Sequence, residues 1–285
     1  MDLINFKVGY KTISLKILDI LLTEQFNNNL TILPNENKSF LGVKDYMGVP
    51  TPVFDLGILL NGRSTESSNL QTLKQLKDGQ KKLMDWFTEL EEQLKKAHTT
   101  STIIKYHPTD FENFYINFKT DSDELKKNMS RFNQLFIALQ TKIVDLIESL
   151  KSHDGQKLIS QIDKIKRNEL IQLERLFESA IEEITLDYKP IIVFTTKDGT
   201  APHVGLLVDK VEDNIEYKQE DIKPLDKVTS IGFDIDPQTK NMMIGLIKLT
   251  DKHSLLIEPS AIFQPVNETS SLVENEQETQ PYGLF

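Results

Sequence analysis

The sequence contains no cysteine. Disulfide bonds and thiolate metal sites are therefore excluded, and the composition fits a reducing compartment. The sequence also lacks an apolar run of the roughly 20 residues that a membrane-spanning helix needs. Its first residues, MDLIN, show no basic segment followed by an apolar core, as a secretory signal would. We therefore expect a cytoplasmic protein that does not insert directly into a membrane.

Basic residues are also in deficit. Lysine and arginine number 33 against 43 aspartates and glutamates, which gives a formal net charge of -10 at pH 7. Nucleic acids and anionic membrane surfaces are bound by clustered cations, so both are poor partners for this chain. With 285 residues, of which 39% are hydrophobic, the chain is long enough for one large domain or two ordinary ones. The expected partners are other proteins.

Catalytic motifs are missing too. The sequence has no glycine-rich nucleotide loop, no nucleophile elbow and no kinase signature. Its histidines are scattered, without the paired spacing of metal ligands; they are His98, His107, His153, His203 and His253. Acidic pairs such as Glu91-Glu92 stand beside lysines on polar helix faces, which is the ordinary solvated arrangement. The sequence predicts no catalytic residues, and so no enzyme.

Helical periodicity is the strongest positive signal, and it extends from Asn69 to Leu186. Apolar residues recur there at steps of four and three, with one step of five between Ile165 and Leu170. Three runs show this spacing: Leu83, Phe87, Leu90, Leu94 and Ala97; then Leu125, Met129, Phe132, Phe136, Leu139, Ile143, Leu146 and Leu150; then Ile162, Ile165, Leu170, Leu173, Phe177, Ile181 and Ile184. The spacing places one apolar stripe on each helix, and such stripes are buried against one another. We predict an antiparallel helical bundle.

Both flanks of this block have the pattern of short strands. Apolar and polar residues alternate from Leu3 to Leu60, and the pattern returns after Asp187, with glycine and proline turns between the strands. A small barrel must close to hide its edges, so we expect the two flanks to form one antiparallel β domain with the bundle inserted at a surface loop. The polar stretch from Asn61 to Ser68 is expected to be a linker. The predicted fold class is α+β.

Three segments of the flanks carry a family pattern. They are Phe40-Leu41-Gly42-Val43, Met47 to Leu56 (MGVPTPVFDL), and Val204 to Val211 (VGLLVDKV) followed by Ile231-Gly232. In this order and spacing they resemble the two halves of a CheW-type chemotaxis coupling domain. The resemblance covers most residues outside the bundle and the tail, and it implies a two-lobed β-barrel body that acts by binding proteins. Where this family usually has an arginine before the glycine of a turn, this chain has Met47.

The helical block resembles the chemoreceptor zinc-binding (CZB) domain, which is found inserted at this place in some CheW-like proteins. The matching scaffold residues include Trp86, Phe111-Glu112, Phe114-Tyr115, Asn117-Phe118-Lys119-Thr120 and Phe132. The family's four zinc-ligand positions hold Leu83, Thr109, Phe136 and Gln140. Zinc needs imidazole, thiolate or carboxylate ligands, which these side chains do not supply. The resemblance therefore implies a bundle of this type without zinc, and we expect no other cofactor.

The resemblance also implies an organisation of the chain. Residues 1–61 form the first half of the CheW-like domain, residues 62–187 the inserted bundle, and residues 188–265 the second half. Residues 266–285, rich in glutamate, glutamine, asparagine and serine, are expected to form a disordered tail. The face that relatives use for binding maps to Ile17, Asp19, Met47 and Val49.

The function implied is that of an adaptor in a two-component chemosensory system. Such a scaffold couples the cytoplasmic tip of a chemoreceptor to the regulatory domain of a histidine kinase by protein binding, without catalysis. A second hypothesis is a sensor module. In that case the helical insert binds a small apolar ligand or another protein and modulates the CheW-like domain, and a pocket between Trp86, Phe114 and Phe136 would favour this interpretation.

Overall fold

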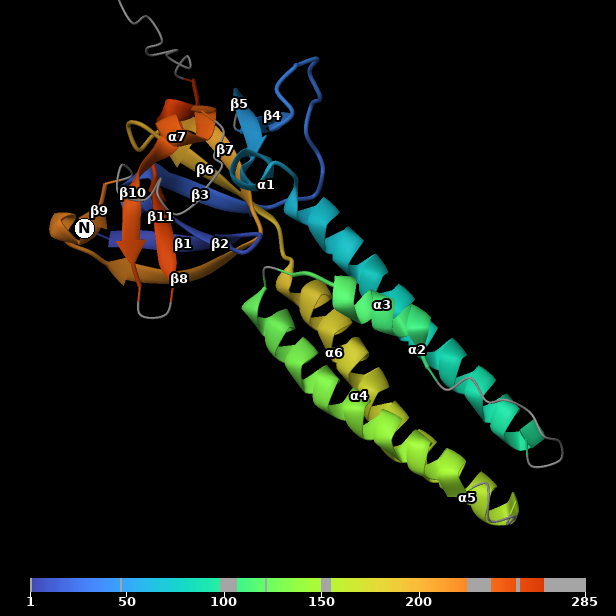
Figure 1. Ribbon diagram of the computed structural model, residues 1–285. Coiled ribbons are helices and arrows are strands. Elements are labelled where there is room, and N and C mark those ends of the chain that lie inside the picture. The colour runs from blue at the N-terminus through green and yellow to red at the C-terminus, as the bar shows by residue number, and fades with distance from the viewer. Residues whose placement is uncertain are drawn as a thin grey trace, which may run out of the picture.

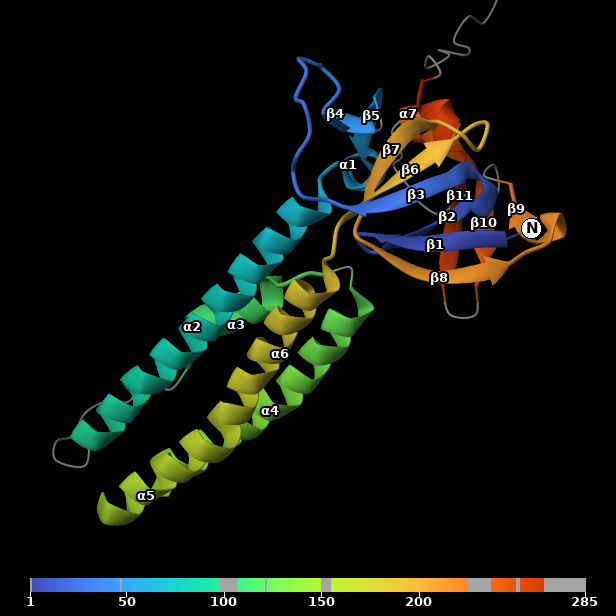
Figure 2. The ribbon, with the colours of Figure 1, turned by 180° about the vertical axis from the view of Figure 1, so that it is seen from behind.

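The computed structural model describes residues 2–46, 48–97, 107–120, 122–149, 155–224, 237–249 and 252–263. It shows two β-sheets packed as a body, and a long helical arm that projects from one end of that body (Figures 1 and 2). The fold is thus a mixture of helix and sheet. The predicted tail lies outside the described residues, as does the expected strand at 231–233.

The larger sheet has six strands in the order β8-β1-β2-β11-β10-β9. Its strands are β1 (Asp2–Val8), β2 (Lys11–Lys16), β8 (Lys210–Glu216), β9 (Ile222–Lys223), β10 (Met243–Lys248) and β11 (His253–Ile257). The pairs are antiparallel except β2 with β11, which is parallel. Opposite Asn5 the pairing of β1 with β8 shifts register, because Ile4 pairs with Asn214 whereas Phe6 pairs with Val211. β8 therefore bulges at this point.

The smaller sheet has five strands in the order β3-β6-β7-β5-β4. They are β3 (Ile20–Gln25), β4 (Phe40–Tyr46), β5 (Val49–Asp55), β6 (Ile191–Thr196) and β7 (Pro202–Val208). The pairs are antiparallel except β5 with β7. In each sheet, strands from before the bundle pair with strands from after it: β1 with β8 and β2 with β11, β3 with β6 and β5 with β7.

The prediction of a closed antiparallel barrel is wrong. Two of the pairs are parallel, and within the described chain neither ladder returns to its first strand. The smaller sheet comes nearest to closing, through one bridge in which the Thr31 and Val43 backbones exchange hydrogen bonds of 2.8 and 2.9 Å. Gly42 permits this approach, since a Cβ there would lie 2.6 Å from the Thr31 carbonyl oxygen.

Each sheet is buried on both faces, which accounts for the lobes. A shared core lies between the sheets and includes Phe6 and Ile13 from the larger one and Val193 and Leu206 from the smaller. The outer face of the larger sheet carries a second cluster of Leu3, Tyr217, Ile247 and Leu256. The outer face of the smaller sheet carries a third, of Val53, Ile192, Phe194 and Leu207. A sheet that is buried on both faces needs apolar or weakly polar residues at consecutive positions. The run IIVFTT of β6, from Ile191 to Thr196, is an example.

The arm is a bundle of four helical segments, each of which runs in the opposite direction to the one before it (Figure 1). Its elements are α2 (Thr65–Ala97), α3 (Thr109–Asn117), α4 (Asp123–Ser149), α5 (Gly155–Ile165), the π-helical turn η3 (Lys166–Leu170) and α6 (Ile171–Asp187). The last three form one returning rod. The three predicted apolar stripes meet in a single cluster, separate from the clusters of the sheets, apart from the Ala97 side chain and Leu150, which lie outside the described part. Among the described helices, none is long and apolar enough to cross a membrane.

The expected linker from Asn61 to Ser68 is wrong in detail, because helix occupies most of it. The short helix α1 (Leu56–Asn61) starts where the Asp55 carboxylate accepts a hydrogen bond of 3.1 Å from the Ile58 amide. It ends at Gly62, whose left-handed φ of 72° lets the Gly62 N–H return to the Ile58 carbonyl. α2 begins only three residues later, so the polar residues there form its first turn, in which Glu66 and Ser67 are exposed and Thr65 is buried.

Candidate partner-binding surface

Two of the predicted binding residues lie on η1 (Ile17–Asp19), one 3-10 turn through which the chain passes from β2 to β3 and so from one sheet to the other. The turn holds apolar side chains in solvent: Ile17 is 37% exposed and Leu18 is 82% exposed. Burial of a leucine side chain in a partner would contribute about 1.5–3 kcal/mol, so Leu18 is a suitable anchor. We did not predict Leu18. The signal was available, because the alternation of Ile13, Leu15 and Ile17 breaks there.

Asp19 adds a charge beside these apolar groups. Its carboxylate lies 3.9 Å from the Lys16 ammonium, which also lies 3.4 Å from Glu258. Burial raises the pKa of the Asp19 carboxyl above its ordinary value; Lys16 opposes this shift and Glu258 adds to it. One carboxylate oxygen of Asp19 is buried without a hydrogen-bond donor. An N–H or O–H group from a partner could satisfy it.

The third predicted residue, Val49, is the first residue of β5 and is 39% exposed. In the turn before it, Gly48 has a φ of 83° and its N–H donates to the Asp45 carboxylate at 2.9 Å. Tyr46 stacks on Phe194 with ring centroids 5.9 Å apart, which fixes the end of β4 against the smaller sheet. Met47, the fourth predicted residue, lies outside the described residues.

The strand register places η1 and Val49 at one end of the smaller sheet. Ile20 pairs with Thr195, Thr195 pairs with Val204, and Val53 pairs with Gly205. Ile20, the first residue of β3, is therefore level with Pro52 of β5, with β6 and β7 between them. Val49 lies three residues before Pro52, at the same end of the sheet as η1. Three strand spacings amount to about 14 Å, which one protein interface of standard size can cover. Ile17, Asp19 and Val49 can thus contact the same partner.

A small recess of about 200 Å³ lies beside Asp19. It is lined by Thr195, Thr196 and Lys197 at the end of β6, by His203 on β7, and by Glu258 to Ser260 after β11. Burial lowers the pKa of His203, and the nearby Lys197 lowers it further, so the imidazole is neutral near pH 7. Its Nε2 atom is buried without a partner. The recess therefore offers polar groups next to the exposed apolar ones, an arrangement suited to binding and not itself a catalytic constellation.

Comparison with known proteins gives little. No family model matches the chain, and no curated protein matches it. Among solved structures, the chain is similar to the scaffolding protein TtCheW from Thermoanaerobacter tengcongensis, with a TM-score of 0.39 and 13% sequence identity over 90% of this chain and 88% of that one.

The four positions that the CZB resemblance assigns to zinc ligands differ in their surroundings. Leu83 and Phe136 are buried in the bundle core, whereas Thr109 is exposed at the start of α3. Gln140 donates a hydrogen bond of 2.9 Å to the carboxylate of Glu112. Within the described ranges, no three His, Asp or Glu side chains gather as metal ligands do. The local chemistry is apolar packing with one polar pair, and the absence of zinc stays a prediction.

The aromatic side chains around these positions pack against each other. Phe111 of α3 is fully buried, and its ring centroid lies 4.9 Å from that of Phe136 and 5.4 Å from that of Phe132. The ring of Phe114 covers Gly79, so closely that a Cβ on Gly79 would be 2.3 Å from it. Phe111 thus packs against both Phe114 and Phe136, two of the three side chains between which the sensor hypothesis placed a ligand.

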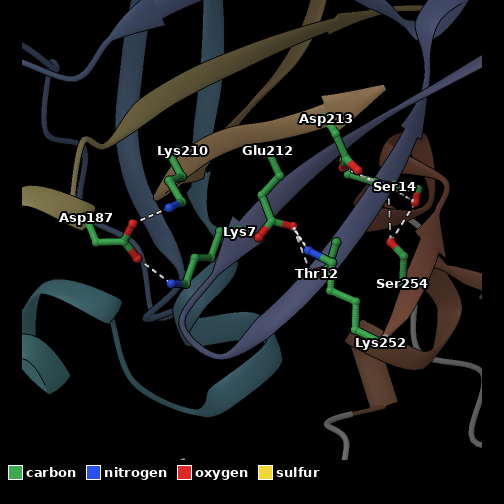
Figure 3. Close-up of polar contacts among 10 residues, drawn as sticks. Lys7, Thr12, Ser14, Asp187, Lys210, Glu212, Asp213, Lys252 and Ser254 are labelled. Atoms are coloured by element: carbon green, nitrogen blue, oxygen red, sulfur yellow. Dashed lines mark hydrogen bonds and ion pairs between the residues drawn. The ribbon is translucent and has the colours of Figure 1, made fainter. Parts of the chain in front are cut away.

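The junction of arm and body is held by ion pairs that sequence reasoning missed (Figure 3). Asp187, the last residue of α6, pairs with Lys7 of β1 and with Lys210 of β8. Burial alone would raise the pKa of Asp187, but Lys210 and Lys7 outweigh it, and the pKa lies below its ordinary value. The three residues are far apart in the sequence, so only the strand pairing of β1 with β8 brings them together.

A buried polar network lies on the outer face of the larger sheet (Figure 3). The Ser14 hydroxyl donates to the Asn5 side-chain oxygen at 2.6 Å and lies 2.6 Å from the Ser254 hydroxyl. The Asn5 amide donates to Asp213 at 2.8 Å, across the bulge of β8. Alternation predicts that Asn5 faces solvent, yet it is fully buried, since the sheet curls around a second core. Its groups are satisfied, which indicates a structural role.

Proposed function

We propose that this protein is a non-enzymatic adaptor of a chemosensory signalling complex, which couples the cytoplasmic tip of a chemoreceptor to the regulatory domain of a histidine kinase. The motif resemblance suggests the class of function. The observation that supports binding is the exposed apolar turn η1, with Leu18 82% exposed on a backbone held between two sheets. Ile17, Asp19, Met47 and Val49 are proposed as partner-binding residues, and Leu18 is added to them.

The proposal predicts that a charge placed on this surface weakens partner binding. Leu18→Glu, Val49→Glu and Met47→Glu should each cost more than about 1 kcal/mol of binding free energy, because each forces a carboxylate into an apolar contact. The measurement is a titration of each variant of the full chain against a purified kinase regulatory domain and, separately, a receptor cytoplasmic fragment.

Val211→Glu is the matched control. Val211 is 48% exposed on β8, on the other sheet. The Val211→Glu variant gains the same negative charge, and it should bind the kinase regulatory domain and the receptor fragment as tightly as the unchanged chain does. If all four variants bind alike, this surface is not the interface. If only the melting temperature falls, the side chain concerned packs within its own turn.

We also propose that residues 62–187 form an insert in one β body made of residues 1–61 and 188–265, with a tail at 266–285. The proposal is supported by strand pairs that join the two flanks in both sheets, and by the separate apolar cluster of the arm. Joining Ser64 to Tyr188 by a short glycine-serine linker should leave a folded body, because loop-closure entropy changes slowly with length.

Circular dichroism and thermal melting test this shortened chain. It should keep a β-type spectrum and a cooperative transition, at a lower temperature than the full chain, since Lys7 and Lys210 lose Asp187. A non-cooperative, unfolded product would show that arm and body share one core.

A further inference from the structure

A groove of about 290 Å³ runs between α4 and the returning helical rod, far from the surface on the sheets. α4 supplies Lys142, Asp145 and Leu146 to its wall, and α5 with η3 supplies Lys164, Ile165 and Glu169. Most of the polar residues stand at the rim, where they are exposed, while Leu146 and Ile165 form an apolar wall. Its volume is close to the lower bound for sites that bind small molecules.

Glu169 is the unusual residue of this groove. It is only 8% exposed and occupies a position of the apolar stripe, between Ile165 and Leu173. One carboxylate oxygen accepts a hydrogen bond from the Lys142 ammonium. The other, Oε2, is buried without any donor. A buried acceptor without a donor costs roughly 1–3 kcal/mol, and more when the group is charged, so a purely structural role for this side chain is unfavourable.

The backbone at this point is also irregular. Lys166 to Leu170 form a π-helical turn inside an otherwise regular α-helical rod. A π turn inserts one extra residue and turns the following side chains, and here the consecutive residues Glu169 and Leu170 are both buried. Such turns are rare and occur frequently at functional sites. Glu169, on this turn, is among the residues that line the groove between the helices.

We propose that this groove binds a small organic cation whose primary ammonium or guanidinium group takes the place of the Lys142 ammonium at the Glu169 carboxylate and so also reaches the buried Oε2. A cation matches the unsatisfied anionic acceptor, and its aliphatic stem can pack on Leu146 and Ile165. Lys142, whose side chain is 50% exposed, already holds the other oxygen and therefore competes with the ligand. The proposal concerns the arm alone and does not depend on the adaptor function.

Agmatine, which carries a guanidinium and an ammonium on a four-carbon stem, is a suitable probe. Isothermal titration of the full chain should show saturable binding at one site per chain, with a dissociation constant below about 1 mM. Glu169→Gln should weaken binding at least about tenfold, since a hydrogen bond to a charged group is lost. Lys142→Gln should strengthen it, because the competing ammonium is removed, and a merely structural ion pair would not give this result.

Matched controls separate the site from the net charge. Glu178→Gln on α6 and Lys127→Gln on α4 make the same charge changes at exposed positions away from the groove, and should leave binding unchanged. Pentanoate, an anion of similar length, should not bind. The proposal is overturned if agmatine shows no saturable binding up to about 10 mM, or if folded Glu169→Gln, checked by circular dichroism, binds as tightly as the unchanged chain.

Discussion

Replacing Phe111 by alanine is expected to destabilise the helical arm by about 3–5 kcal/mol. The Phe111 side chain is fully buried and its ring contacts those of Phe114, Phe132, Phe136 and Phe177. Truncation removes the only ring of α3 that reaches all of these partners within the described residues, and leaves a cavity that rigid helices fill poorly. Trp86, the single tryptophan, lies on α2, so its fluorescence in a denaturant titration reports unfolding of the arm.

Ile116→Ala is the control for this prediction. Ile116 stands on the same short helix but is 72% exposed, so its truncation should change the free energy of unfolding by no more than about 0.5 kcal/mol. Hydrogen exchange of the strand amides should be unaffected in Phe111→Ala if arm and body unfold separately. Equal loss of protection in the sheets would contradict the proposed insert and make the whole chain one cooperative unit.

Replacing Asp209 by asparagine is expected to stabilise the protein at pH 7.5 by about 2 kcal/mol and to flatten the dependence of stability on pH. Asp209 is 6% exposed and accepts a hydrogen bond of 2.6 Å from the Gly9 N–H. Burial raises the pKa of its carboxyl to about 6, the charge of Asp55 adds to this, and Gly9 and Lys7 oppose it. An asparagine side-chain oxygen can accept the same hydrogen bond without the buried charge.

The direction of this pH dependence follows from the pKa of the Asp209 carboxyl in the folded and in the unfolded chain. In the unfolded chain the carboxyl has its ordinary pKa of 3.8, so between about 4 and 6 the folded state binds the proton more tightly. The stability from this group is fully present below pH 3.8 and is lost as the pH rises through about 6. The free energy of unfolding of Asp209→Asn minus that of the wild type should therefore grow as the pH rises over that range. Exposed Asp163→Asn should show no such trend, and a variant less stable at every pH would mean that Gly9 requires the charged carboxylate.

The helical arm was predictable because its signal is local. Three stripes of apolar residues at helical spacing place Leu83, Phe136 and Phe177 inside the bundle, and the structure buries all three. The π turn at Lys166 does leave a local mark, a step of five residues from Ile165 to Leu170, but that step alone does not distinguish a π turn from a break between two helices.

The sheets were predicted less well, for reasons that depend on distance along the chain. The strands were recognisable, but which strands pair, and whether a pair is parallel, depends on contacts between the two flanks. The polar stretch after Asn61 has the composition of a linker, and serine and threonine are also favoured in the first turn of a helix, so composition alone does not separate the two. In the candidate site, the resemblance predicts Ile17, Asp19 and Val49, whereas the exposure of Leu18 is known only from the fold. The ion pairs of Asp187 with Lys7 and Lys210 likewise follow from the fold and not from the sequence.

The interleaving of the two flanks has a consequence for how the chain is made. Ser14 and Ser254, which touch in the finished protein, are 240 residues apart, so the first strands leave the ribosome long before their partners exist. The arm, whose contacts are comparatively local, can fold in the interval. Its two ends then return to the same place, at Thr65 and Asp187. We therefore expect the folded arm to keep its two ends close together during synthesis, so that the strands made last emerge next to the strands made first.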